Sequence, residues 1–228
     1  MPSTTAGETP PIHYRPHQDP ISSHQQICRI VRELNRGPVL DVGAAQGMLG
    51  MALSGSGIDI DAVEPNPTWA ELARPYYRAV HACAIENAPL GTREYRAIVC
   101  GDVLEHTPDP VSVLRKLIEV ATPDATFVIS LPNVAHLAVR SMLLFGKFPK
   151  MQRGILDRTH LQFFTKDTAI AMLKEAGLSV QRTTATGVPL DEVWKGGDGR
   201  LMYRFATRCQ HLAVAALPRL FAMQWIFV

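Results

Sequence analysis

The chain has 228 residues, a length that suits one domain. Hydrophobic residues make up 46% and charged residues 19%, values typical of a water-soluble protein with a large core. The formal net charge is only +2 and the basic residues are scattered, which argues against nucleic acid as a partner. The four cysteines form no CxxC pair, and this favours buried free thiols over disulfides or a metal site.

The two ends of the chain differ in composition. Residues 1–20 are rich in Pro, Ser, Thr and His without the basic-then-apolar order of a signal peptide, so we expect a mobile arm before a domain at 21–228. The apolar stretch 212–228 is only 17 residues long and is interrupted by Pro218 and Arg219, so it is too short to span a bilayer. We therefore expect no integral membrane segment and a cytoplasmic location. The sequence leaves a homodimer open.

Strand-like and helical patterns alternate along the chain. A first helix can begin at Ser22 or Ser23 and end before Gly37-Pro38, and a later one can begin at Asp109-Pro110. The predicted strands are residues 38–42, 58–63, 79–85, 95–100, 126–131, 178–184 and 220–228. Further helices are predicted over residues 48–53, 68–77, 134–145 and 166–176. This alternation predicts an α/β fold with a doubly wound parallel sheet, whose last strand pairs antiparallel.

Two segments interrupt the alternation. Residues 146–161 carry little secondary-structure signal, and a loop of that length in a compact domain is usually a lid or a binding element. We predict a small helical lid from segments 134–164 and 189–217. The apolar side chains of the first segment could line an acceptor pocket or form the packed underside of a cap. They are Phe145, Phe148, Met151, Leu161, Phe163 and Phe164.

The first strand runs into a glycine turn. Ligands of parallel sheets bind beyond the carboxyl ends of the strands, and Gly43 and Gly47 allow the backbone to approach a ligand closely. Ala45 is also small. Asp41, at the strand end, would place a carboxylate near a ligand's amino group. Glu64 ends the second strand, where a carboxylate can accept hydrogen bonds from both hydroxyls of a ribose.

The spacing of this turn limits the ligand. It reads G-x-A-x-G, which fits neither the G-x-G-x-x-G of dinucleotide sites nor a GxxxxGK[ST] phosphate loop. The turn therefore suits a ligand without phosphate that carries an amino-acid tail and an adenosine. The alternative is a turn that merely connects strand and helix.

Several segments in order resemble the class I S-adenosylmethionine-dependent methyltransferase superfamily. The resemblance covers about residues 22–184 and is closest to the ubiquinone-biosynthesis-like small-molecule O-methyltransferase branch. It implies a Rossmann-like seven-stranded sheet of order 3-2-1-4-5-7-6 and the cofactor S-adenosylmethionine. The segments that carry it are 39–47, Glu64, 95–110, 131–133, 154–160 and 163–165.

Further residues are candidates for cofactor contacts. Pro65, after the ribose carboxylate, is a further candidate for cofactor binding, and Asp102, after the fourth strand, is expected on the cofactor side or as a residue that positions the loop. One departure concerns adenine: relatives often carry Asp after the third strand, where this chain has Ala84. Ile85 could still offer its backbone N–H to adenine and pack on the ring, and recognition could shift to Glu86.

Methyl transfer from a sulfonium is an in-line displacement, so holding the nucleophile about 3 Å from the methyl group supplies most of the catalysis. A hydroxyl acceptor also benefits from a general base, usually histidine. The candidates are His106 and His160, although His106 could instead brace its loop and His160 could anchor the lid. Histidines and acids show no metal-ligand spacing, so no metal is expected. Candidate substrate-binding residues are Asn133, His136, Arg158 and Phe163.

Four functions remain open at this stage. Methyl transfer to a small-molecule hydroxyl is the first hypothesis. N- or C-methylation on the same fold is the second, because the nucleophile is decided by pocket geometry. A non-catalytic S-adenosylmethionine-binding protein would be consistent with Ala84. A nicotinamide-dependent oxidoreductase is disfavoured by the glycine spacing.

Overall fold

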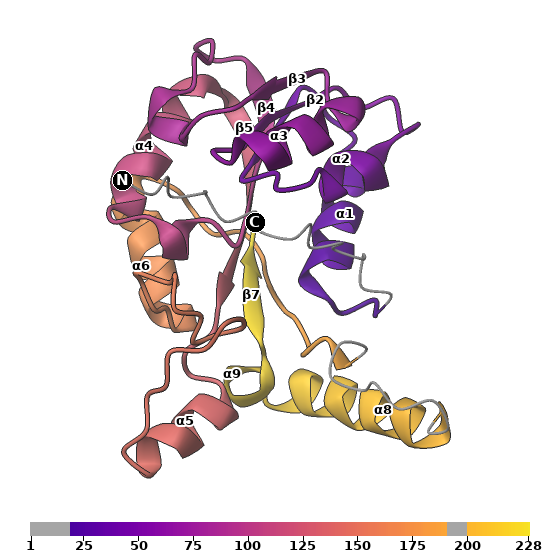
Figure 1. Cartoon of the computed structure of the whole chain (residues 1–228), viewed down its shortest axis with the longest axis vertical. Coiled ribbons are helices and arrows are strands. Elements are labelled where there is room, and N and C mark those ends of the chain that lie inside the picture. Colours follow the sequence, from indigo (N-terminus) through magenta and orange to yellow (C-terminus); the bar gives the residue numbers. More distant parts are fainter. Residues whose placement is uncertain (1–18, 191–199) are drawn as a thin grey trace, which may run out of the picture.

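The computed structural model describes residues 19–190 and 200–228. The predicted arm at 1–20 therefore lies almost entirely outside the described residues, as does part of the second lid segment. The described residues contain a seven-stranded sheet of order β3-β2-β1-β4-β5-β7-β6 with helices on both faces (Figure 1). β7 pairs antiparallel with β5 and β6, and the other pairs are parallel. The predicted fold class and strand order are confirmed.

The elements alternate as the sequence predicts. The strands are β1 (Val39–Val42), β2 (Ile60–Val63), β3 (Ala79–His81), β4 (Tyr95–Gly101), β5 (Ala121–Pro132), β6 (Thr183–Ala185) and β7 (Gln224–Phe227). The α-helices are α1 (Ser23–Leu34), α2 (Met48–Leu53), α3 (Pro67–Ala73), α4 (Pro110–Val120), α5 (Leu137–Leu144), α6 (Lys166–Ala176), α8 (Arg200–Ala216) and α9 (Pro218–Phe221). Three short 3₁₀ helices are η1 (Arg74–Tyr76), η2 (Ile85–Asn87) and η3 (Leu104–His106).

Side-chain caps set most helix starts. Ser22 caps α1, and Asp109 caps α4 ahead of Pro110. Thr165 begins α6 with a capping box, and Gly177 ends that helix with φ 101°. The start of α3 differs from the prediction: Asn66 Oδ1, rather than Thr68, accepts the first backbone N–H groups, because Pro67 takes the first helical position.

Three predicted strands are too long. β3 stops at His81, where the Cys83 N–H turns back to the His81 carbonyl and the chain enters η2. β6 covers only Thr183–Ala185, as long as its pairing with β7 lasts. The final strand begins at Gln224 instead of residue 220, because Pro218 starts the short helix α9.

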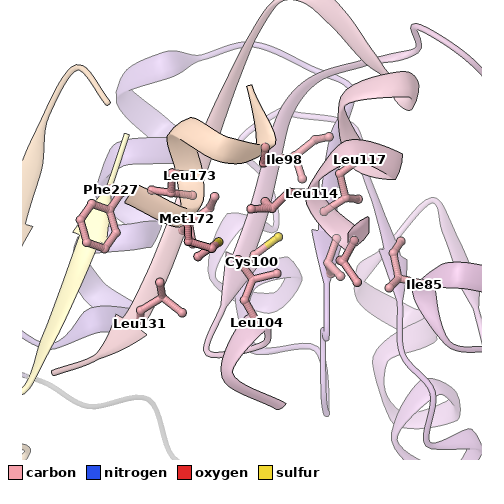
Figure 2. Packing of buried hydrophobic residues seen from close by; sticks show 14 of the residues in the cluster. Ile85, Ile98, Cys100, Leu104, Leu114, Leu117, Leu131, Met172, Leu173 and Phe227 are labelled. Atoms are coloured by element: carbon pink, nitrogen blue, oxygen red, sulfur yellow. The ribbon is translucent and has the colours of Figure 1, made fainter. Parts of the chain in front are cut away.

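The sheet is buried on both faces. Alternate residues of β1 point to opposite sides, so Leu40 packs with α4 and α6 while Val39 packs with α1 and α2. Figure 2 shows the first of these layers, where Leu114 of α4 and Leu173 of α6 meet Cys100 of β4. Each of these three side chains is at most 1% exposed. The resulting rigid sheet fixes the loops at its carboxyl end.

α5 and α8 lie at the lower end of the view in Figure 1, away from α2 and α3. Both helices and the loop after α5 carry exposed apolar side chains, among them Leu144, Phe145 and Phe205. Within 19–190 and 200–228, no helix is both long and apolar enough to cross a membrane. The lid role of segments 134–164 and 189–217 stays a prediction.

Candidate active site

The turn after β1 is a tight backbone structure with three residues in the left-handed region. Gly43, Ala45 and Gly47 have φ of 73°, 48° and 88°. A Cβ on Gly43 would lie 2.6 Å from Val103 Cγ2, and one on Gly47 would lie 2.9 Å from Ala73 Cα. Both glycines are therefore required by backbone conformation and by close packing. The turn is further held by a 2.8 Å hydrogen bond from the Gly43 N–H to the Val63 carbonyl.

Glu64 joins this turn to the end of β2. Its side chain is buried; Oε2 accepts from the Ala45 N–H at 2.7 Å, and Oε1 accepts from the Asn66 N–H at 2.8 Å. Burial raises the pKa of the carboxyl, and the two backbone donors act in the opposite direction. A carboxylate oxygen has two lone pairs, so each oxygen keeps capacity for one more donor. The remaining acceptor capacity of the two Glu64 oxygens fits the two hydroxyls of a ribose.

Asp41 belongs to a buried hydrogen-bond network. Its Oδ2 accepts a 2.5 Å hydrogen bond from the Tyr77 hydroxyl, which itself accepts from the Gly50 N–H at 3.0 Å. Burial raises the pKa of Asp41 to about 7, and the nearby Glu64 adds to that rise. A Cβ on Gly50 would lie 2.7 Å from the Tyr77 ring, so this network also depends on a glycine. Asp41 thus links β1 to α2, and contact with a cofactor amino group stays a prediction.

The residues predicted near the adenine and the ribose differ in their exposure. Ile85 is buried among the core residues, so its side chain is committed to packing and we expect only its backbone N–H to face adenine (Figure 2). Glu86 is exposed at the surface of η2, and its carbonyl accepts a hydrogen bond from Lys116. Pro65 is exposed beside Glu64. Ala84 precedes η2 in an extended conformation.

Asp102 follows β4 with φ 56°, a left-handed conformation that Asp tolerates better than most residues. Its Oδ1 accepts from the Ser130 hydroxyl at 2.7 Å and its Oδ2 from Gln224 Nε2 at 2.6 Å. The Asp102 N–H donates to Ser130 Oγ at 3.0 Å. Burial raises the pKa of Asp102, while these hydrogen bonds counteract the rise. The residue ties the ends of β4, β5 and β7 together.

The structure brings His106 and His160 into contact, with ring centroids 4.8 Å apart in an edge-on arrangement. Glu105 precedes His106 in η3, and its Oε1 is 4.0 Å from His160 Nε2. Fully buried Leu104 anchors η3 in the core (Figure 2), and the Leu161 and Gln162 N–H groups donate to the Glu105 carbonyl. Residues that are 54 positions apart in sequence therefore meet at the carboxyl end of β4.

The two histidines are differently exposed. The His160 side chain is 7% exposed, and burial lowers its pKa, which favours the neutral ring. His106 is exposed, and its Nδ1 lies 3.3 Å from the Thr159 carbonyl. Glu105 is fully buried, and burial together with the nearby Asp102 raises its pKa well above the ordinary range.

The predicted substrate residues fall into two groups. Asn133 is buried, with Nδ2 donating to the Ala222 carbonyl, and His136 caps α5 by accepting from the Ala138 N–H. Both therefore serve the local backbone. Phe163 lies next to His160, with ring centroids 6.3 Å apart, and next to Phe148 at 5.3 Å. Arg158 is exposed in the same loop.

Sequence reasoning missed two residues of this region. Glu105 was passed over although it stands three residues after Asp102 and directly before His106, a spacing that places all three at one strand end. Tyr77 gave no signal, because only the fold brings it to Asp41. The cluster of Glu105 with the two histidines was also unexpected, since the sequence shows no metal-ligand spacing.

Comparisons with known proteins identify the family and support the fold. The methyltransferase domain family matches residues 18–183, well over half of the chain. The ubiquinone biosynthesis O-methyltransferase of Nitrosospira multiformis is 27% identical over 185 residues, which is 75% of either chain. An S-adenosylmethionine-dependent methyltransferase from Archaeoglobus fulgidus superposes with a TM-score of 0.59 at 17% identity, covering 90% of this chain and 92% of the other.

A second similar structure contains bound S-adenosylhomocysteine. It is the Burkholderia thailandensis 1,6-didemethyltoxoflavin-N1-methyltransferase with bound S-adenosylhomocysteine, with a TM-score of 0.58, 17% identity and coverage of 91% and 77%. The chain belongs to the methyltransferase domain family. It is an S-adenosylmethionine-dependent methyltransferase, as the sequence predicts.

Proposed function

We propose that this enzyme transfers the methyl group of S-adenosylmethionine to a hydroxyl oxygen of a small molecule bound beyond β4 and β5. The observation that carries the proposal is the contact between His106 and His160 at the carboxyl end of β4. β4 is the direct neighbour of β1, whose glycine turn leads to Glu64. A methyl donor held by Glu64 would meet its acceptor beyond the carboxyl ends of these strands, and the position of the histidine pair after β4 supports its part in the reaction.

The choice of oxygen rests on proton handling. A neutral amine already offers a lone pair to the methyl group, whereas a hydroxyl is a weak nucleophile until it loses its proton. Two neighbouring imidazoles beside a buried carboxyl group form a site that can promote this loss. The O-methyltransferase name of the Nitrosospira relative supports the same choice.

The bound cofactor supplies an electrophilic methyl group on a positively charged sulfur. The chain's own residues hold and orient the reactants: Glu64 takes the ribose, and the turn from Gly43 lets the backbone approach the amino-acid tail. Phe148 and Phe163, in edge-on contact beside His160, offer an apolar wall for the acceptor. Segment 134–164 would then act as a lid that excludes water.

The test uses methyl-labelled S-adenosylmethionine and matched acceptor pairs that differ only in the nucleophile, such as phenols and the corresponding anilines. We expect label in methyl ethers. Labelled amines without ethers would overturn the choice of oxygen and favour N-methylation, the activity named for the Burkholderia neighbour.

A His106→Ala variant provides the second half of this test. Because His106 is exposed and lies outside the Glu64 turn, we expect turnover to fall at least tenfold while calorimetry shows unchanged affinity for S-adenosylmethionine. Unchanged turnover would remove the histidine pair from the mechanism. Loss of the folded state by circular dichroism would assign His106 to bracing its loop through Thr159.

A further inference from the structure

Three metal-ligating side chains form a compact cluster outside the cofactor turn. Glu105 and His106 come from η3, and His160 comes from the loop between α5 and α6. One ligand atom from each of the three lies within 4.8 Å of the others, a spacing that a single cation could bridge after small side-chain adjustments.

The second observation is that the Glu105 side chain lacks a partner. The residue is 0% exposed, and neither carboxyl oxygen makes a hydrogen bond to the part of the chain that the structure describes. His160 Nε2, at 4.0 Å from Oε1, is beyond hydrogen-bond distance. A buried carboxyl group without partners is costly and usually pairs with a charge or coordinates a metal.

The histidines are oriented for coordination. His160 Nδ1 lies 3.0 Å from the Ile155 carbonyl, which can only accept, so this nitrogen carries the proton and Nε2 keeps its lone pair. That Nε2 is the atom that faces Glu105. Metal-binding histidines are commonly fixed in this way, by donating the other ring N–H to a carbonyl.

His106 is oriented in the same way, by a hydrogen bond from its Nδ1 to Thr159. The Thr159 hydroxyl donates its one proton to Asp157 Oδ1 at 2.6 Å, so it can only accept from His106. The Thr159 carbonyl also accepts. His106 Nδ1 must therefore be the donor, and its Nε2 remains available.

Asp102 adds negative charge beside the cluster. Its oxygens are taken by Ser130 and Gln224, yet its carboxylate still acts electrostatically on Glu105 and on both histidines. An extra anion next to three neutral or anionic ligands favours a dication over any anionic occupant.

We propose that Glu105, His106 and His160 bind one divalent transition-metal cation of the zinc type, with an open position for the acceptor's oxygen. Two imidazoles and one carboxylate form the ligand set of many catalytic zinc and non-haem iron sites. The inference rests on the proposed function and deepens it, since the histidine pair then promotes proton loss by holding a cation. It replaces the expectation from sequence that no metal is bound.

The chemistry balances without a further reactant. The acceptor hydroxyl, bound to the cation through its oxygen, releases its proton to water because the cation lowers the hydroxyl pKa. An oxygen lone pair then forms the new O–C bond while the C–S bond breaks, and the electron pair of that bond returns to sulfur. The products are a methyl ether and a neutral thioether.

The test measures binding without turnover. Tag-free protein is stripped with a chelator and titrated with Zn²⁺ by calorimetry and with Co²⁺ by visible absorption. We expect one ion per chain and the absorption of Co²⁺ bound to nitrogen and oxygen ligands. Glu105→Gln and His160→Gln should each weaken Zn²⁺ binding at least a hundredfold. The control His211→Gln changes a histidine that pairs with Asp19 and should bind Zn²⁺ normally.

Two results of the binding measurements would overturn the proposal. One is the absence of micromolar binding for Zn²⁺, Co²⁺, Fe²⁺ and Mn²⁺. The other is binding that neither Glu105→Gln nor His160→Gln weakens while both variants keep the native circular dichroism spectrum. Hydroxyl methylation that survives in chelated, metal-free enzyme would refute this inference and leave the proposed function intact. One bound ion per chain together with amine-only methylation would do the reverse.

Discussion

Two buried glutamates at the carboxyl ends of β2 and β4, the strands on either side of β1, have opposite surroundings. Glu64, at the end of β2, is 3% exposed and accepts two backbone hydrogen bonds. Glu105, just beyond β4, is 0% exposed and accepts none through its side chain from the described residues. The same residue type is therefore preorganised at one end of the site and left unsatisfied at the other.

We interpret this difference through the two ligands that we propose for the site. The cofactor is constant, so its half of the site can be completed by the chain itself, with backbone donors aimed at Glu64 and glycines packed against Val103 and Ala73. The half of the site that we assign to the acceptor keeps a buried carboxyl group without a hydrogen-bond partner among the described residues. An unsatisfied buried polar group in a native protein requires an explanation, and a catalytic role or a bound ion is one.

We expect the largest effect from replacing Glu64, the glutamate whose carboxylate accepts two backbone hydrogen bonds. Glu64→Ala removes two charge-assisted hydrogen bonds to a ribose at about 1.5–3 kcal/mol each, so we expect roughly a thousandfold loss of S-adenosylmethionine affinity. Calorimetry measures it, with Glu71→Ala as the control because Glu71 is exposed and pairs with Arg74. Affinity within threefold of the parent would show that Glu64 does not hold the cofactor.

The next effect is a pH dependence of stability from Asp41. Its pKa is about 7 when folded and close to 3.9 when unfolded, so its contribution is complete below pH 4 and is lost as pH rises to 7. At about 1.4 kcal/mol per unit, the loss approaches 4 kcal/mol as an upper limit. Asp41→Asn can still accept from Tyr77 and escapes this loss. The variant should therefore gain stability relative to the parent between pH 4 and 7.

Urea denaturation at several pH values checks this prediction. Asp124→Asn serves as a control of opposite sign, because hydrogen bonding to Thr122 lowers the pKa of Asp124. A parent and Asp41→Asn variant whose unfolding free energies stay parallel from pH 4 to 8 would contradict the burial argument.

The sequence predicted the fold well because local signals and global topology agree here. The capped helices α1, α4 and α6 and the apolar strands of the sheet centre follow from periodicity and from Ser22, Asp109 and Thr165. The edge elements were predicted less well. β6 and β7 are bounded by their mutual pairing and by Pro218, and pairing partners distant in sequence leave no local signal.

The candidate site likewise contains residues that the sequence predicts and residues that it does not. The turn and Glu64 are readable because backbone geometry demands glycine and an acid at fixed places. Asp41 was assigned from its position at a strand end, but its partner Tyr77 arrives from another element. The Glu105 cluster forms only because the loop between α5 and α6 brings His160 next to the end of β4. Neither the spacing of the residues nor the composition predicts this contact.

A gain in stability is expected at the unsatisfied carboxyl group. Leucine at position 105 removes a buried polar group without partners, so Glu105→Leu should stabilise metal-free protein by about 1–3 kcal/mol. Glu64→Leu should destabilise, since it orphans the N–H groups of Ala45 and Asn66. Denaturation in the presence of a chelator compares the two variants. Destabilisation by both would mean that Glu105 has structural partners and that the contrast between the two glutamates is wrong.

The smallest effect is a difference in stability between alanine substitutions in the turn after β1 and in the loop after α5. Gly43→Ala meets both a φ of 73° and a Val103 methyl at 2.6 Å, whereas Gly146→Ala meets a φ of 66° and open space. The conformational cost is about 1 kcal/mol in either case, and we expect close packing to add about 1 kcal/mol more at Gly43. The double variant Gly43→Ala/Val103→Ala should recover part of that excess, because truncating Val103 removes the clashing methyl. Equal losses of unfolding free energy for Gly43→Ala and Gly146→Ala would mean that the turn adjusts to a methyl group as easily as the loop does. The preorganisation that we assign to the cofactor half would then have to come from the Glu64 hydrogen bonds alone.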